Sequence, residues 1–241
     1  MLMSALPEAS AVSSAAAVIS RSPANSNVGR PVNKEDSCEW ADGVKLHVVE
    51  EFNTVAMNSD WIDDEGFRAN VGIILTNEHG KLMLAGRVGS KGWQFPQGGI
   101  LFGEEAEQAM FRELREEVGL EAGDVEVLGV TSEWLRYRLP DKFVRRNSAP
   151  LCIGQKQRWF MLRLTAPADN VRFDLSDEPE FDRARWVEFW RPVNEVIYFK
   201  RRVYAQALHE LGSTVYPSGL PPRPRWWPKR WRVVFDKDIA R

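Results

Sequence analysis

Residues 104–118 constrain the fold more than any other part of the sequence. They contain no proline or glycine, and Gly119 follows them directly, as expected for a helix that ends on a glycine. At 100° per residue the large apolar side chains fall in one arc, made up of Met110, Phe111, Leu114 and Val118. Glu113, Glu116 and Glu117 fall in the adjoining arc. The pattern predicts an amphipathic helix with one packing face and one acidic face.

The acidic face costs helix stability. Glu113 stands three and four positions from Glu116 and Glu117, spacings at which like charges repel by about a few tenths of a kcal/mol per pair. Carboxylates on one helical face can supply both oxygen ligands and negative charge to a hard divalent cation such as Mg²⁺. From these three residues alone, however, an ordinary solvated acidic face explains the pattern equally well.

The flanking segments predict an α/β domain over residues 61–211. Short apolar runs at 71–75 and 82–84 are separated by a turn-like segment at 77–80, which indicates a β-hairpin. Further elements are expected as strands at 125–130, 158–164 and 184–189 and as a second helix at 193–211. Strands interleaved with two helices favour one α/β domain.

The two ends of the chain differ from this domain in composition. Residues 1–60 begin with a stretch rich in Ala, Ser, Pro and Asn that cannot bury enough surface to offset chain entropy, so we expect a low-complexity, disordered extension. Residues 212–241 combine prolines, basic residues and tryptophans. This composition predicts a mobile tail, with a nucleic-acid-contacting arm as the alternative.

Bulk properties exclude several classes of protein. A length of 241 residues suits one domain with loose ends, and a net charge of -2 argues against a strongly basic, non-specific nucleic-acid binder. No run of 18 apolar residues is present, so the sequence predicts no transmembrane helix. Cys38 and Cys152 form no CxxC pair, which fits a reducing, cytoplasmic compartment.

The helix belongs to a longer spaced pattern. Five residues separate Gly98 from Glu104, seven more precede Arg112, and nine positions are fixed over the 23 residues from Gly98 to Leu120. The defined residues resemble the Nudix box, and the fixed positions are Gly98, Glu104, Arg112, Glu113, Leu114, Glu116, Glu117, Gly119 and Leu120. The resemblance implies the Nudix fold, a mixed β-sheet sandwiched between α-helices. It also implies a metal-dependent hydrolase of nucleotide pyrophosphate linkages.

Motifs outside the box resemble those of the bacterial RNA pyrophosphohydrolases within that family. They occupy residues 64–72, 93–99, 134–137, 152–157 and 179–182. This resemblance, which runs from about residue 62 to 211, implies removal of pyrophosphate from the 5′-triphosphate end of RNA with an unpaired 5′ end. The product is a 5′-monophosphate, and the reaction promotes mRNA decay. Hydrolysis of dinucleoside polyphosphates such as diadenosine tetraphosphate stays the alternative.

The same resemblance implies metal and catalytic roles for particular residues. The expected metal ligands are Glu113, Glu116, Glu117 and Glu180. Mg²⁺ is the expected ion, with Mn²⁺ and Zn²⁺ as alternatives. A glutamate of the box must also act as general base; Glu113 is the first choice and Glu117 the second, since sequence does not separate base from ligand.

Substrate contacts are implied for five further residues. Arg87 and Lys200 are expected to face phosphates, Arg68 and Phe199 to clasp a base, and Tyr137 to contact substrate. Stacking on an unpaired base requires flat groups such as guanidinium and phenyl. Taken without the resemblance, Phe199 on an amphipathic helix is expected to pack into the core.

Two further observations bear on the partner. Seven basic residues within 23 positions suit an anionic polymer, although a solvated loop face explains them equally well; they are Arg136, Arg138, Lys142, Arg145, Arg146, Lys156 and Arg158. A non-catalytic RNA- or nucleotide-binding protein on a degenerate Nudix scaffold is the competing function, but it predicts a broken box. Residues 1–56 precede the matched region, and Met57 is a candidate start.

Overall fold

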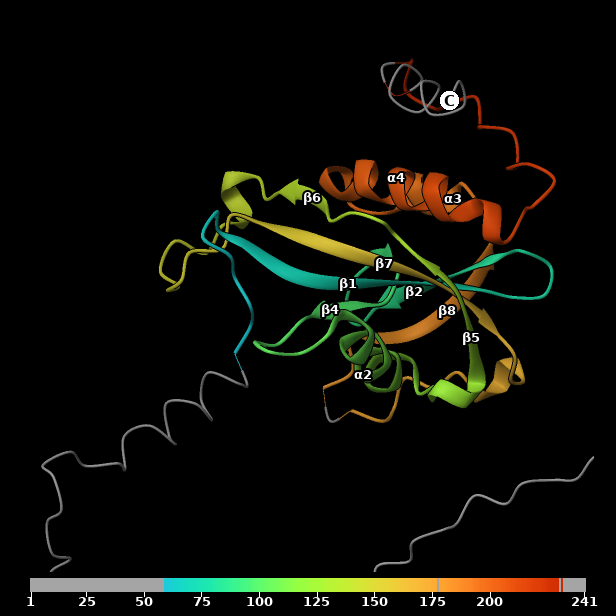
Figure 1. The fold of residues 1–241 in the computed structure, drawn as a ribbon, viewed down its shortest axis with the longest axis horizontal. Helices are drawn as coiled ribbons and strands as arrows, with labels where there is room; N and C mark the ends of the chain where they lie inside the picture. The colour runs from blue at the N-terminus through green and yellow to red at the C-terminus, as the bar shows by residue number, and fades with distance from the viewer. Residues whose placement is uncertain (1–58, 177, 230, 232–241) are drawn as a thin grey trace, which may run out of the picture. The chain divides into compact units, whose positions relative to one another are not determined.

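The computed structural model describes residues 59–176, 178–229 and 231. Within them one mixed β-sheet lies between α-helices, with α2 (Ala106–Val118) on one face and α3 (Arg191–Glu195) and α4 (Arg201–Leu211) on the other (Figure 1). The predicted α/β sandwich is therefore confirmed. The extension expected to be disordered lies outside the described residues up to position 58.

The sheet is built around a long parallel pair. β1 (Phe67–Thr76) pairs with β7 (Gly154–Leu164) from Phe67↔Gly154 to Thr76↔Arg163. On the outer edge of β7 lie β5 (Val125–Val130) and β6 (Leu135–Arg138), and β4 (Gln97–Gly99) pairs with β1. Parallel strands are normally buried on both faces, and β1 follows this rule with nine of its ten residues buried.

The predicted hairpin is confirmed at its turn, where β1 pairs antiparallel with the next strand, but the pairing is short. β2 (Leu82–Arg87) meets β1 only at Thr76↔Leu82 and then pairs with β3 (Trp93–Gln94) and with β8 (Phe181–Val187). Of the three later strands, β5 has the predicted bounds, whereas β7 begins four residues earlier and β8 begins and ends earlier than predicted.

Alternation along β1 assigns its side chains to two separate cores. Val71, Ile73 and Leu75 pack on the α2 side, whereas Ile74 packs with the residues of α3 and α4. Gly72 faces the second core. A Cβ atom at Gly72 would lie 2.5 Å from Cε3 of Trp159, so the absence of a side chain makes room for a fully buried indole ring.

Helix α2 is confirmed, with one shift at its start. It begins at Ala106 after an N-cap at Glu105, whose side chain forms a capping box with Gln108, and it ends at Gly119 with φ 74°. Glu104, expected to be its first residue, lies before the helix because its carboxylate is bonded to Arg112 and to the backbone of Leu101. The acidic face thus projects from a well-capped helix.

The continuous helix predicted at 193–211 is wrong. α3 ends at Glu195, Val196 is extended at ψ 155°, and a 3-10 turn at Tyr198–Lys200 precedes α4. The two β-branched residues Val196 and Ile197 favour extended backbone, which explains why the helical pattern is interrupted there. The interruption forms a corner that carries Phe199 and Lys200.

Residues 212–229 also depart from expectation, since they pack instead of forming a mobile tail. Trp227 is 3% exposed and its ring centroid lies 4.9 Å from that of Trp190. The Tyr216 hydroxyl donates a hydrogen bond to the carbonyl of Gly80 at 2.8 Å. The domain limits at 61 and 211 stay a prediction, and in the described part of the chain no helix is long and apolar enough to cross a membrane.

We expect Trp227→Ala to lower the free energy of unfolding by about 3–5 kcal/mol, because it removes a buried indole ring from the core. Trp226→Ala is the matched control, since that neighbouring ring is 40% exposed and its loss should cost much less. Urea unfolding of both variants measures the difference. Equal costs would show that residues 212–229 contribute no core packing.

Candidate active site

A cavity of about 480 Å³ opens where α2, the sheet and the corner before α4 meet. It brings together all five expected substrate contacts and three of the four expected metal ligands. The sequence-predicted residues that line it are Arg68, Arg87, Gly98, Glu113, Glu117, Tyr137, Glu180, Phe199 and Lys200. The other six fixed positions of the box do not line it; they are Glu104, Arg112, Leu114, Glu116, Gly119 and Leu120.

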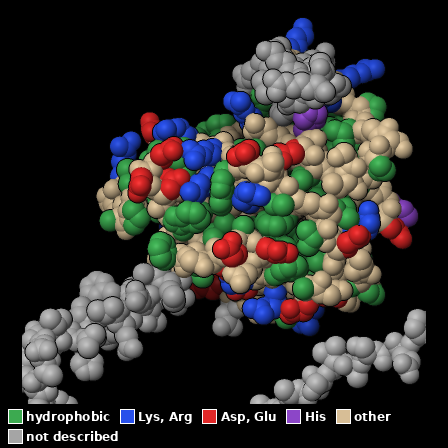
Figure 2. Space-filling view, in the orientation of Figure 1, with side chains coloured by type: hydrophobic (Ala, Val, Ile, Leu, Met, Phe, Trp, Pro, Cys, Tyr) green, Lys and Arg blue, Asp and Glu red, His purple; other side chains and the backbone are tan. Residues whose placement is uncertain are grey.

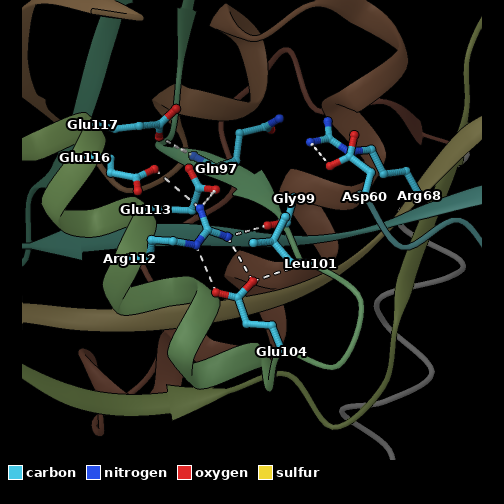
Figure 3. Close-up of polar contacts among 10 residues, drawn as sticks. All are labelled: Asp60, Arg68, Gln97, Gly99, Leu101, Glu104, Arg112, Glu113, Glu116 and Glu117. Atoms are coloured by element: carbon cyan, nitrogen blue, oxygen red, sulfur yellow. Dashed lines mark hydrogen bonds and ion pairs between the residues drawn. The ribbon is translucent and has the colours of Figure 1, made fainter. Parts of the chain in front are cut away.

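Arg112 connects the helix to the loop before it (Figure 3). Its Nη2 donates to the Gly99 carbonyl at 2.7 Å, and Nε and Nη2 donate to the two carboxylate oxygens of Glu104, each at 2.9 Å. Nη1 donates to Oε1 of Glu113 at 2.6 Å. A carboxylate oxygen of Glu116, one helical turn further on, lies 3.4 Å from Nη1 and is a secondary contact. Arg112 therefore holds Glu104 and Glu113 in fixed positions.

The charges in this network reinforce one another. The hydrogen bond to Glu104 raises the pKa of Arg112 above its ordinary value, so the guanidinium stays charged. Burial opposes ionisation of Glu104, but the hydrogen bonds from Arg112 and Leu101 outweigh it and lower the pKa of that carboxyl. Both partners are thus ionised at neutral pH, and the bidentate geometry makes this a strong pair.

Gly98 provides the space in which the Glu113 carboxylate lies. A Cβ atom at position 98 would stand 1.7 Å from Cδ of Glu113. The carboxylate is therefore packed against the backbone of β4, and any side chain at this position would displace it.

Burial raises the pKa of two carboxyl groups of the site. Burial, and then the negative charge of Glu180, raise the pKa of Glu117 well above its ordinary value, and the backbone N–H of Gln97 donates to its Oε2 at 2.8 Å. Burial also raises the pKa of Glu113, although the hydrogen bond from Arg112 opposes the shift. Removing charged carboxylates from water is unfavourable without a cation nearby.

Lys200 lies on the opposite wall of the cavity. The residue is 7% exposed, its Nζ donates to Oε1 of Gln97 at 2.9 Å, and burial lowers its pKa to about 8. Nearby, Arg87 Nη2 lies 3.4 Å from a carboxylate oxygen of Glu180. The cavity thus pairs an acidic wall from α2 with cations from β2 and from the corner before α4.

Oxygen donors dominate the acidic wall, and their chemistry suits a hard divalent cation. As they stand, no three carboxylate, imidazole or thiol groups of the described residues are gathered closely enough to hold a metal ion. Glu113 is turned toward Arg112, and the side chain of Glu116 is 50% exposed. A shared cation would require Glu113 and Glu117 to reorient by side-chain rotation.

An aromatic cluster forms the remaining wall. Phe199 is half-buried, with its ring centroid 5.7 Å from that of Tyr137 and 5.2 Å from that of Phe143. Phe199 is thus packed on one side while it lines the cavity. Arg68 lines the same cavity and is held by an ion pair with Asp60 at 2.7 Å.

Three amide side chains of the site were not assigned a role from the sequence. Asn70 and Gln157 are buried on the central strands, and Gln97 lines the cavity. The signal that could have found them is a polar residue inside an otherwise apolar strand, because buried polar groups need hydrogen-bond partners. Asn70 interrupts the apolar sequence of β1 in this way.

The basic run does not form a uniform positive surface. Arg136 pairs with Glu65 at 2.7 Å, Arg146 with Asp141 at 3.8 Å, and the nearly buried Lys156 with Asp63 at 3.1 Å. Basic and acidic side chains are mixed at the end of the molecule where β6 lies (Figure 2). Arg145 is the member of the run that lines the cavity.

Comparison with known proteins agrees with the geometry. The family model described as NUDIX domain matches residues 66–208, which is over half of the chain. The chain belongs to the Nudix family. The matched residues include the whole box, from Gly98 to Leu120.

Two curated Nudix relatives are named RNA pyrophosphohydrolase. The one from Alkalilimnicola ehrlichii is 58% identical over 68% of this chain and 90% of its own length. The one from Methylococcus capsulatus is 59% identical over 62% of this chain and 78% of its own length. Among solved structures, a C. elegans Ap4A hydrolase binary complex is 17% identical with a TM-score of 0.45, covering 61% of this chain and 98% of that chain.

We expect Gly98→Ala to lower kcat for triphosphorylated RNA by about a hundredfold with little loss of stability, because its Cβ pushes the Glu113 carboxylate out of place. Gly123→Ala is the control, since a Cβ there meets no atom within 4 Å. Steady-state rates and melting temperatures of both variants are compared. A Gly98→Ala enzyme with normal kcat would mean that the position of Glu113 does not matter for turnover.

Proposed function

We propose that this Nudix protein is an RNA pyrophosphohydrolase, which removes pyrophosphate from the 5′-triphosphate end of RNA, leaves a 5′-monophosphate and so promotes mRNA decay in the cytoplasm. The observation that carries the proposal is the cavity itself, which is lined by an acidic wall, by the basic side chains Arg87 and Lys200 and by an aromatic wall. The names of relatives that are 58–59% identical support the same activity.

A divalent cation completes this proposal. Glu113, Glu117 and Glu180 would hold it, with Glu116 as a further ligand at the rim, and a cation there would offset the burial and repulsion that raise the pKa of Glu117. Mg²⁺ fits hard oxygen donors and phosphate substrates, with Mn²⁺ and Zn²⁺ as alternatives. When bound, it supplies charge to the phosphate oxygens and lowers the pKa of a water molecule.

The protein's own residues divide the remaining work. Lys200 and Arg87 bind phosphate oxygens and neutralise the charge that develops as water attacks phosphorus. Glu113 accepts the proton from that water, because Arg112 both orients its carboxylate and favours its ionised form. Glu117 stands beside it as a ligand, since a bound cation would offset the burial and the negative charge of Glu180 that raise its pKa.

The aromatic wall favours a polyphosphate that carries a base over one that carries none. The Phe199 ring is supported by Tyr137 and Phe143, so it presents a fixed face on which an unpaired base can stack. The flat guanidinium of Arg68, which lines the same cavity, completes the base site. Dinucleoside polyphosphates carry the same combination of base and polyphosphate and are the competing substrate class.

We expect triphosphorylated RNA with an unpaired 5′ end to exceed diadenosine tetraphosphate in kcat/KM at matched salt. Phe199→Ala should cost about 1–3 kcal/mol in kcat/KM for RNA, the scale of one stacked base, and Arg68→Ala, measured alongside, should cost a similar amount.

Phe102→Ala is the control for these measurements, because that ring is 58% exposed and does not line the cavity. Phosphate-release assays with Mg²⁺ and both substrates give the rates. The RNA assignment fails if the dinucleotide is the better substrate, and the polyphosphate hydrolase then replaces it.

A further inference from the structure

Gln97 contacts both walls of the site. Its side-chain oxygen Oε1 accepts a hydrogen bond from Lys200 Nζ at 2.9 Å, and its backbone N–H donates to Oε2 of Glu117 at 2.8 Å. Glu117 comes from α2 and Lys200 from the corner before α4, elements on opposite faces of the sheet. Gln97 therefore lies where the two halves of the site meet.

A pair of buried amides lies beside the Gln97 side chain. Its strand β4 lies beside β1, which in turn pairs with β7, so that Asn70 and Gln157 are direct partners in the sheet. Gln157 Nε2 donates to Asn70 Oδ1 at 2.8 Å and lies 3.5 Å from Gln97 Oε1. Because Asn70 and Gln157 are 1% and 0% exposed, water does not compete for these groups.

A neutral acceptor has a particular advantage for Lys200. A buried ammonium needs a hydrogen-bond partner, and the negative charges that act on Lys200 are those of Glu180 and Glu117. A direct ion pair with either carboxylate would neutralise the ammonium and occupy a carboxylate oxygen. In the structure as described, the hydrogen bond of Lys200 goes to the neutral amide oxygen of Gln97, so its positive charge faces the cavity without a direct ion pair to either carboxylate.

We infer that Gln97 is a positioning residue for Lys200: its side-chain oxygen holds the ammonium away from Glu117 and Glu180, so that the charge faces the phosphates of the substrate. The inference rests on the proposed function, in which Lys200 binds phosphate. Gln97 acts through Lys200 and is assigned no contact with the reacting atoms.

A double-mutant cycle tests this role. Gln97→Met keeps the length of the side chain and removes its acceptor, so kcat/KM for triphosphorylated RNA and for diadenosine tetraphosphate should fall about ten- to a hundredfold. Binding of inorganic tripolyphosphate, measured by calorimetry on the full chain, should weaken as well. In a Lys200→Met background the same change should alter each quantity by less than about twofold.

Two further variants control the cycle. Gln206→Met, a half-buried glutamine on α4 outside the cavity, should leave rates and binding unchanged. Gln97→Ala is measured in the wild-type and Lys200→Met backgrounds as well, so that a folding defect of Gln97→Met alone does not decide the result. Melting temperatures are recorded for each protein.

Coupling to Lys200 separates positioning from a general structural role. An equal loss from Gln97→Met in both backgrounds, or no loss in the wild-type background, overturns the inference. Failure of the RNA assignment would be a different result, in which RNA is a poorer substrate than diadenosine tetraphosphate. In that case the coupling between Gln97 and Lys200 is still measured with diadenosine tetraphosphate and with tripolyphosphate.

Discussion

The hydrogen bonds of Arg112 connect the glutamate helix to the loop that precedes it, and the geometry of the site depends on them. One guanidinium contacts the Gly99 carbonyl, both carboxylate oxygens of Glu104, and Glu113. A guanidinium, with five donors in a fixed planar fork, can bond all four acceptor atoms at once, whereas an ammonium has only three donors. The acidic face, unfavourable for helix stability by itself, is in this way partly balanced.

The sheet supplies the second constraint, because it brings the two walls of the site together. Side chains alternate along β1 into two cores, so that α2 packs on one face and α3 with α4 on the other. The cavity forms where elements from both faces reach the same edge. The interruption after Glu195 is needed for this arrangement, since it turns Phe199 and Lys200 toward the carboxylates of α2.

The parts of the site that follow from local pattern could be predicted from the sequence. The box defines a helix, its glycine end and its acidic face, and the structure places Glu113 and Glu117 in one cavity with Glu180, 63 residues beyond Glu117. Roles carried by tertiary pairing could not be predicted in the same way. Asn70, Gln97 and Gln157 meet only because β4, β1 and β7 are neighbours in a particular register. The packing of Trp227 likewise depends on a contact with Trp190 that composition does not reveal.

The role of the Arg112 network is tested most directly by a double-mutant cycle of Arg112→Lys and Glu104→Gln, measured on kcat/KM for triphosphorylated RNA. If Arg112 positions Glu113 through its pair with Glu104, each single variant breaks the same network. The double variant should then lose less than the sum of the two, with a coupling of about 0.5–3 kcal/mol. Losses that add to within about 0.5 kcal/mol would contradict the account, because Arg112 and Glu104 would then act independently.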